Sequence, residues 1–298
     1  MISFSFSHEW QDHAAPIYAI TPYKNNCFFT GGADKIVALW DVEKKENLPF
    51  HIKVDFGIYH LHFSENNNLL FISQSKGGVH VINTKEKKET AYLLGHKKGV
   101  YKTLVSAKHN VILCLGGDGL CSVWDLKTYK HVKTIPISSG KLRDAIIIDD
   151  HVWIGCGSGN LTQLNLINLT ATKTLQIAKD AIYTILPHPK NSNILLCAGK
   201  DALIYASNLM TGQTFTFPAH NFGIYKLLYI PNTNLIASCS RDKSIKIWDV
   251  TDYSFVQKLT FQNRIGHTNS INNMLLEPNT NTLVSVGDDK RIIAWKAT

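Results

Sequence analysis

Long apolar runs are absent from this sequence. No stretch approaches the roughly 18 apolar residues that a membrane-spanning helix needs, and the first ten residues have neither a basic leader nor a long apolar core. We therefore expect no membrane segment and no secretory signal. Charged residues are also few, at 18% of the chain, while apolar residues make up 44%, a composition typical of a soluble globular protein.

Cysteine is sparse and scattered. The six cysteines lie far apart in the sequence, mostly inside apolar runs that read as strands: Cys27, Cys114, Cys121, Cys156, Cys197 and Cys239. This distribution favours buried free thiols over disulfides. Free thiols persist in a reducing compartment, so we expect a cytoplasmic protein.

No compact cluster of metal-ligating residues is evident. His60 and His62 lie on one face of an expected strand, with His51 and His80 in the same region, but no carboxylate or cysteine joins them. A zinc or transition-metal site needs several such ligands in a suitable geometry. We expect no metal and no cofactor.

Charge of neither sign is concentrated in one long run. The 31 basic and 23 acidic residues give a net charge of +8, yet basic clusters such as residues 42–46 contain their own acids. The excess is compatible with nucleic acid or an acidic partner. The absence of a contiguous basic run argues against nucleic acid as the favoured ligand.

The sequence does contain a repeated hairpin pattern. In residues 235–250, two β-rich runs flank the polar turn 240–243, and apolar residues alternate in 245–248. In four places an aspartate precedes a tryptophan by six residues, and a histidine lies 21 or 22 residues before that aspartate. These sets are His13, Asp34 and Trp40; His96, Asp118 and Trp124; His220, Asp242 and Trp248; and His267, Asp289 and Trp295.

A period near 40 with Gly-His and Trp-Asp marks resembles the WD-repeat family of β-propellers. Spacing places Ile82-Asn83, Leu164-Asn165 and Ser207-Asn208 at the Trp-Asp position of three weak repeats. The resemblance covers the whole chain and implies one all-β domain, residues 1–298, a seven-bladed β-propeller of four-stranded antiparallel blades. The expected repeats are approximately 13–55, 57–94, 95–138, 139–178, 179–218, 219–262 and 266–298.

The two ends of the chain complement each other. The last repeat stops after its third expected strand, whereas residues 2–8 alternate with period two and precede the first repeat. We expect this N-terminal strand to pair into the last blade, which would close the ring and leave no open edge between the first and last blades.

Serine, histidine and aspartate together could suggest a nucleophilic catalytic site. The same set recurs at blade spacing, however, and the resemblance implies internal chains of hydrogen bonds from indole to hydroxyl to imidazole to carboxylate. In repeat three, Cys114 occupies the hydroxyl position, so that chain should be broken or weak. The structural sets are His13, Thr30, Asp34 and Trp40; His96, Asp118 and Trp124; His220, Ser238, Asp242 and Trp248; and His267, Ser285, Asp289 and Trp295.

A second recurrence suggests a binding surface. The innermost strand of five repeats opens with an aliphatic residue followed by tyrosine, and alternation would turn the tyrosine away from the core toward the mouth of a central channel. Tyrosine is enriched at interfaces, although simple packing of the inner strands is an open alternative. The candidate partner-binding residues are Tyr18, Tyr59, Tyr101, Arg143, Tyr183, Tyr225, Asn272, Lys102, Lys200, Lys226 and Arg241.

These patterns favour a non-enzymatic, monomeric scaffold that binds a peptide or protein, possibly acidic, on the tyrosine-bearing face. Two alternatives stay open. Binding of nucleic acid or another polyanion through the basic rim would fall steeply with salt, and a propeller enzyme would need convergent carboxylates or a bound metal. The identity of the partner is not encoded in any motif.

Overall fold

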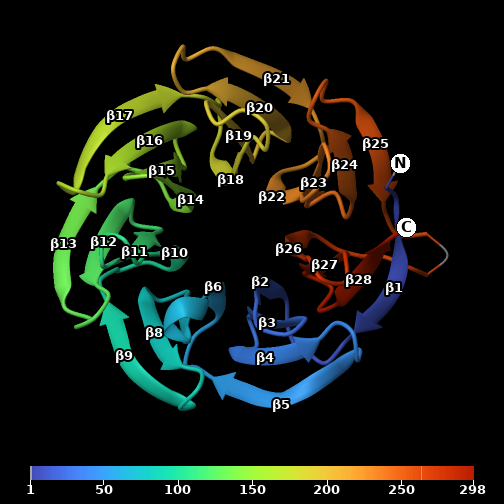
Figure 1. Cartoon of the computed structure of the whole chain (residues 1–298), viewed down its shortest axis with the longest axis horizontal. Coiled ribbons are helices and arrows are strands. Elements are labelled where there is room, and N and C mark those ends of the chain that lie inside the picture. Colours follow the sequence, from blue (N-terminus) through green and yellow to red (C-terminus); the bar gives the residue numbers. More distant parts are fainter. Residues whose placement is uncertain (1, 263) are drawn as a thin grey trace. The chain divides into compact units, whose positions relative to one another are not determined.

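The computed structural model describes residues 2–262 and 264–298, which form 28 strands and one 3-10 turn, η1 (Glu65–Asn67). The chain divides into two compact units, Met1–Asp55 with Leu186–Thr298 (unit 1) and Phe56–Ile185 (unit 2). The described strands form seven antiparallel sheets of four strands each, and they can be followed by label and colour in Figure 1. This confirms the predicted all-β class and the seven four-stranded blades.

Unit 2 holds blades two, three and four. Blade two consists of β6 (Ile58–Ser64), β7 (Leu69–Gln74), β8 (Gly78–Asn83) and β9 (Lys88–Leu94). Blade three consists of β10 (Val100–Ser106), β11 (Val111–Gly116), β12 (Leu120–Asp125) and β13 (His131–Pro136). Blade four consists of β14 (Leu142–Ile148), β15 (His151–Cys156), β16 (Asn160–Asn165) and β17 (Thr170–Gln176).

Unit 1 holds blades one, six and seven. Blade one consists of β2 (Ile17–Pro22), β3 (Cys27–Gly32), β4 (Ile36–Asp41) and β5 (Glu46–Lys53). Blade six consists of β22 (Ile224–Ile230), β23 (Leu235–Ser240), β24 (Ile245–Asp249) and β25 (Phe255–Leu259). Blade seven consists of β26 (Ile271–Glu277), β27 (Thr282–Gly287), β28 (Ile292–Ala297) and β1 (Phe4–Trp10).

Blade five consists of β18 (Ile182–Pro187), β19 (Ile194–Gly199), β20 (Leu203–Asn208) and β21 (Thr214–Pro218). The first of these strands begins in unit 2, and the other three belong to unit 1. The predicted weak repeats two, four and five are therefore complete blades, because the strand pattern survives where the His and Trp marks are lost.

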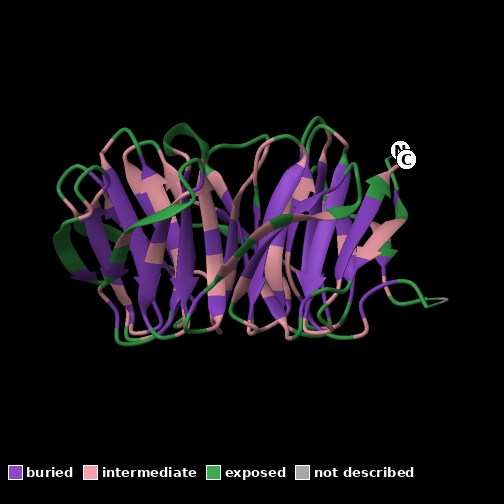
Figure 2. Cartoon of the chain, turned by 90° about the horizontal axis from the view of Figure 1, so that it is seen from below, coloured by how far each residue is buried: buried purple, intermediate pink, exposed green. Residues whose placement is uncertain are grey.

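Burial falls from the second strand of a blade to the fourth. Every residue of β3, β7, β11, β23 and β27 is buried, whereas β13 and β17 are mostly exposed. Figure 2 shows the buried residues in purple, mostly within strands, and the exposed residues in green, mostly in the connecting turns. Strands with neighbours on both edges and both faces need apolar residues throughout, which explains the continuous runs such as Val-Ile-Leu-Cys-Leu in β11.

The N-terminal strand completes the last blade. β1 pairs antiparallel with β28, from Phe4 opposite Ala297 to Trp10 opposite Ile292. Trp10 then joins a buried cluster that contains Trp40 of blade one and Ile292 of blade seven. The predicted pairing is confirmed, and the first and last repeats share one hydrophobic core within unit 1.

All six cysteines are buried free thiols, as expected from their positions. Burial raises the pKa of the Cys114 and Cys239 thiols to about 12, which keeps them protonated and unreactive at neutral pH. In the described part of the chain, no helix has the length and apolarity needed to cross a membrane.

Candidate functional site

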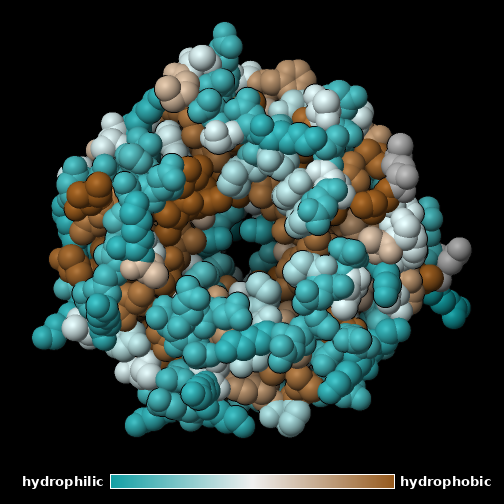
Figure 3. All heavy atoms as spheres, viewed as in Figure 1, coloured by the Kyte–Doolittle hydropathy of each residue, from teal (hydrophilic) through white to brown (hydrophobic). Residues whose placement is uncertain are grey.

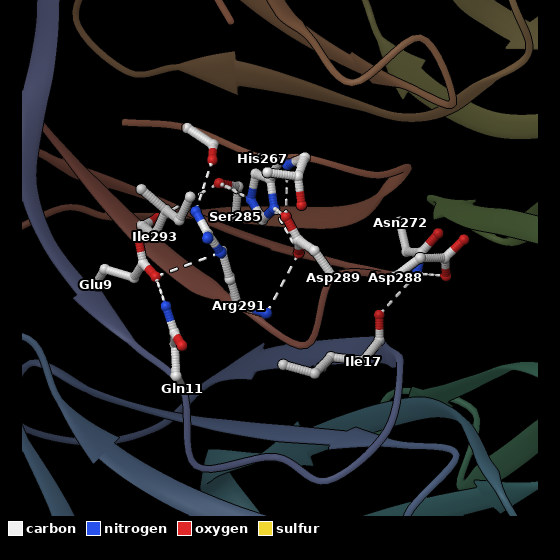
Figure 4. A network of polar contacts seen from close by, with 12 residues as sticks. Glu9, Gln11, Ile17, His267, Asn272, Ser285, Asp288, Asp289, Arg291 and Ile293 are labelled. Atoms are coloured by element: carbon white, nitrogen blue, oxygen red, sulfur yellow. Dashed lines mark hydrogen bonds and ion pairs between the residues drawn. The ribbon is translucent and has the colours of Figure 1, made fainter. Parts of the chain in front are cut away.

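Three blades carry the same internal chain of hydrogen bonds. In blade seven, Trp295 Nε1 donates to Ser285 Oγ at 2.9 Å. The same hydroxyl lies 2.9 Å from His267 Nε2, and His267 Nδ1 lies 2.9 Å from Asp289 Oδ1 (Figure 4). The equivalent atoms in blades one and six are 2.6–2.9 Å apart. With the carboxylate accepting from Nδ1–H, Nε2 is the acceptor for the hydroxyl proton.

The aspartates of these sets are held ionised. Burial opposes ionisation of Asp242 and Asp289, but hydrogen bonds from His220 and His267, and from backbone N–H groups, outweigh it and lower the pKa of both carboxyls. Asp289, for example, accepts from the backbone N–H of Thr268. Each carboxylate therefore ties the loop before the innermost strand to the following turn.

Blade three corrects one prediction. The chain of hydrogen bonds is not broken, because Ser122 supplies the hydroxyl that Cys114 lacks. Ser122 Oγ lies 2.9 Å from His96 Nε2 and accepts from Trp124 Nε1 at 2.9 Å. Cys114 and Ser122 are directly opposite on paired strands, so either side chain can reach the same space.

These sets are not placed for chemistry on a substrate. The side chains of Thr30, Ser238 and Ser285 have no exposed surface, and each hydroxyl already bonds an indole and an imidazole. Such chains satisfy buried polar groups that would cost about 1–3 kcal/mol each if left unpaired. The geometry supports an internal structural role.

The weak repeats keep a different mark. Asn83, Asn165 and Asn208 occupy the position of the Trp-Asp aspartate, and each Oδ1 accepts two backbone N–H groups of the following turn. Asp41 makes the same pair of bonds with Glu43 and Lys44. An Asx turn explains why Asp or Asn stands there in six of the seven repeats, whereas the last repeat has Lys296.

Six of the eleven candidate partner-binding residues lie at β-bulges. In the innermost strands that begin at Ile17, Ile58, Val100, Leu142, Ile224 and Ile271, the register shifts at the second residue. The residues at the shift are Tyr18, Tyr59, Tyr101, Arg143, Tyr225 and Asn272. A bulge turns a side chain away from the regular pleat, and all of these residues are half-buried while the preceding aliphatic residue is buried.

Unit 2 brings four of the candidate partner-binding side chains into contact. The rings of Tyr59 and Tyr101 stack with centroids 5.0 Å apart and planes 19° from parallel. The Arg143 guanidinium carbon lies 4.8 Å from the Tyr101 centroid and 4.4 Å from the Tyr183 centroid. These residues form one layered row, Tyr59–Tyr101–Arg143–Tyr183, which we call the tyrosine row.

Two glycines make room for this row. A Cβ atom on Gly99 would lie 2.7 Å from Cε2 of Tyr59, and one on Gly117 would lie 2.9 Å from Cε2 of Tyr101. Both distances are shorter than real Cβ contacts, so a larger residue at either position would displace a ring.

The basic residues around these positions differ in whether an acidic side chain neutralises their charge. Lys102 is paired with Asp144 at 2.7 Å and contributes no free charge, whereas Lys141 is exposed with its ammonium 5.7 Å from the Tyr101 ring. Sequence reasoning missed both Asp144 and Lys141. The signal for Asp144 was a single acid in the apolar run 142–148.

In unit 1 the candidate residues have more varied surroundings. Asn272 donates both amide hydrogens, to the carbonyl of Ile17 and to Asp288 (Figure 4). The Arg241 guanidinium lies over Phe222 at 5.9 Å. Lys200 is exposed, while Tyr18, Tyr225 and Lys226 are half-buried. On the face in view in Figure 3, hydrophilic side chains predominate over the loops.

The histidine pair of blade two does not form a metal centre. His60 Nδ1 accepts the backbone N–H of Thr103 at 3.3 Å, and the His62 ring packs against Phe71. Burial and the charge of Lys102 lower the pKa of His62 to about 4. Among residues 2–262 and 264–298, no group of three or more ligating side chains could hold a metal ion.

Comparison with known proteins gives matches over much of the chain. The family model for the WD domain, G-beta repeat, matches residues 4–41, 212–249 and 256–296. Protein tipD of Dictyostelium discoideum is 26% identical over 270 residues, which cover 87% of this chain and 44% of that protein. Transducin beta-like protein 3 of Bos taurus is 30% identical over 130 residues, 42% of this chain and 16% of that protein.

WD repeat-containing protein AAC3 of Dictyostelium discoideum is 28% identical over 189 residues, 59% of this chain and 39% of that protein. The chain thus spans less than half the length of each of these relatives. The three matched repeats, together with the seven four-stranded antiparallel blades, support a WD-repeat, seven-bladed β-propeller.

Proposed function

We propose that this chain is a non-enzymatic scaffold that binds a peptide or protein partner through the bulged ends of its innermost strands. WD-repeat propellers serve generally as protein-interaction scaffolds. The observation that carries the proposal is the tyrosine row of unit 2, which holds three half-buried phenol rings and a guanidinium in fixed stacking contact.

Such a row is suited to binding a protein. Tyrosine and arginine offer large amphipathic contact area, and side chains that are already stacked lose little further entropy on binding. The basic side chains of this region, with Lys141 and Arg143 foremost, favour an acidic segment. The buried free thiols suit a reducing cytoplasm, and we propose a monomer as the working state.

Nucleic acid is the alternative partner, because the chain carries a net charge of +8 and stacked aromatic residues also bind bases. The row itself favours protein, since Tyr101 is already stacked on Tyr59 and on Arg143, and Tyr183 on Arg143, so that no base can enter between them.

Affinity capture with the full chain tests the proposal. The wild type should retain a set of proteins that the Tyr59→Ala/Tyr101→Ala variant loses, while Tyr92→Ala, on the outer strand β9, should retain them all. Melting curves must show that the double variant is folded. Equal capture by all three chains would overturn the proposed surface. Capture that disappears after nuclease treatment would favour nucleic acid instead.

A further inference from the structure

The guanidinium of Arg143 is fixed in place and lacks a counter-ion. Tyr101 and Tyr183 cover it at 4.8 and 4.4 Å, contacts that attract a cation toward the ring faces. No ion pair or hydrogen bond joins the guanidinium to another residue of the described chain. Stacking occupies its faces and leaves the N–H groups on its edge for another acceptor.

The adjacent carboxylate cannot serve as that acceptor. Asp144 is 5% exposed, and its Oδ1 atom accepts from Lys102 Nζ at 2.7 Å and from the backbone N–H of Ala145 at 3.0 Å. Its Oδ2 atom accepts the backbone N–H of Ile185 at 3.0 Å. Both oxygens of the carboxyl next to Arg143 therefore already accept hydrogen bonds inside the unit. This carboxyl pairs with Lys102 rather than with Arg143.

A half-buried, unpaired guanidinium is costly in a structural role, because burial removes part of its hydration with no compensating anion. The same arrangement favours binding. A planar fork of N–H donors held by stacking matches the two oxygens of a carboxylate and loses little entropy when it binds them.

We propose that Arg143 is the carboxylate receptor of the tyrosine row, so that the partner segment presents an aspartate or glutamate side chain to it. This inference rests on the proposed function and adds the chemistry of recognition. A carboxylate fits better than a phosphate dianion, because the planar guanidinium fork pairs with two oxygens and carries a single positive charge.

The test is direct binding of a defined probe to the full chain. Fluorescein-labelled, capped hexaglutamate is titrated at low salt against the wild type, Arg143→Gln and Arg143→Lys, with capped hexaglutamine as the neutral probe. Lys133→Gln on the outer strand β13 is the control for loss of one positive charge. We expect hexaglutamate to bind the wild type, Arg143→Gln to weaken binding at least tenfold, and Arg143→Lys to weaken it several-fold because lysine lacks the planar fork.

If hexaglutamate does not bind the wild type, or if Arg143→Gln and Lys133→Gln weaken its binding equally, the assignment of Arg143 as the carboxylate receptor is wrong. Competition by inorganic phosphate at concentrations where acetate has no effect would replace carboxylate by phosphate and also overturn it. Thermal melts identify any variant that is not folded, and Arg143→Lys then serves as the milder substitution. If the tyrosine variants lose captured proteins but hexaglutamate binding ignores Arg143, the scaffold proposal stands and this one fails.

Discussion

Cys114 and Ser122 lie directly opposite each other on β11 and β12, and Ser122 carries the hydroxyl that blades one, six and seven take from the position of Cys114. The residues equivalent to Ser122 in those blades are Ala38, Lys246 and Ile293. The hydrogen-bond chain is thus conserved in space although the residue that supplies its hydroxyl has moved to the neighbouring strand.

Ser122→Ala should lower the free energy of unfolding by about 2–3 kcal/mol, because it removes the partner of both the Trp124 indole and the His96 imidazole. Cys114→Ser in the same chain should recover most of that loss by restoring the arrangement of the other blades. Denaturant titration of the two single variants and the double variant checks this. A double variant no more stable than Ser122→Ala would contradict the prediction that a hydroxyl at position 114 can replace the hydroxyl of Ser122.

The joining of the first and last repeats depends on Trp10. Trp10 is 6% exposed in the core shared by blades one and seven, so Trp10→Ala should cost about 3–5 kcal/mol. Phe6, on the same strand and 39% exposed, is the matched control, and Phe6→Ala should cost about 1 kcal/mol. Equal shifts of the denaturation midpoint would show that β1 contributes little through its buried end.

Acid should destabilise the protein partly through His62. Its folded-state pKa of about 4 lies below the ordinary 6.5, so the unfolded chain takes up the proton first. The stabilisation is complete above pH 6.5 and is lost as the pH falls toward 4, by about 2 kcal/mol between pH 7 and pH 5. His62→Gln should flatten this part of the stability profile, whereas exposed His51→Gln should leave its slope unchanged. Parallel profiles for the wild type and His62→Gln would refute the assignment.

The outer strand of blade five is the least protected edge. Among the seven outer strands of the described residues, β21 alone has neither a charged side chain nor a register shift in its pairing. Lysines and bulges hinder pairing of exposed edges. Thr216→Lys should therefore delay aggregation on heating several-fold, followed by light scattering, and change stability by less than about 0.5 kcal/mol. Val132→Lys on β13, beside Lys133, should have little effect on aggregation.

Spacing located the repeats of this fold, and their resemblance to the WD-repeat family implied the blades. The six-residue step from Asp34 to Trp40 recurs at Asp242 and Trp248, and alternation in residues 2–8 predicted the pairing of β1. Such features are local and periodic, so each recurrence strengthens the same inference. The candidate tyrosines were found in the same way, by recurrence after an aliphatic residue.

What the sequence by itself determined was therefore the repeat: which residues form each blade, and which of them turn toward the core. Only the tertiary structure decided how side chains from different repeats combine. It assigned the hydroxyl of blade three to Ser122, paired Lys102 with Asp144, and stacked Arg143 between Tyr101 and Tyr183. The physical reason is that these contacts join neighbouring strands or successive blades, and their energies depend on distances and burial that no local pattern encodes.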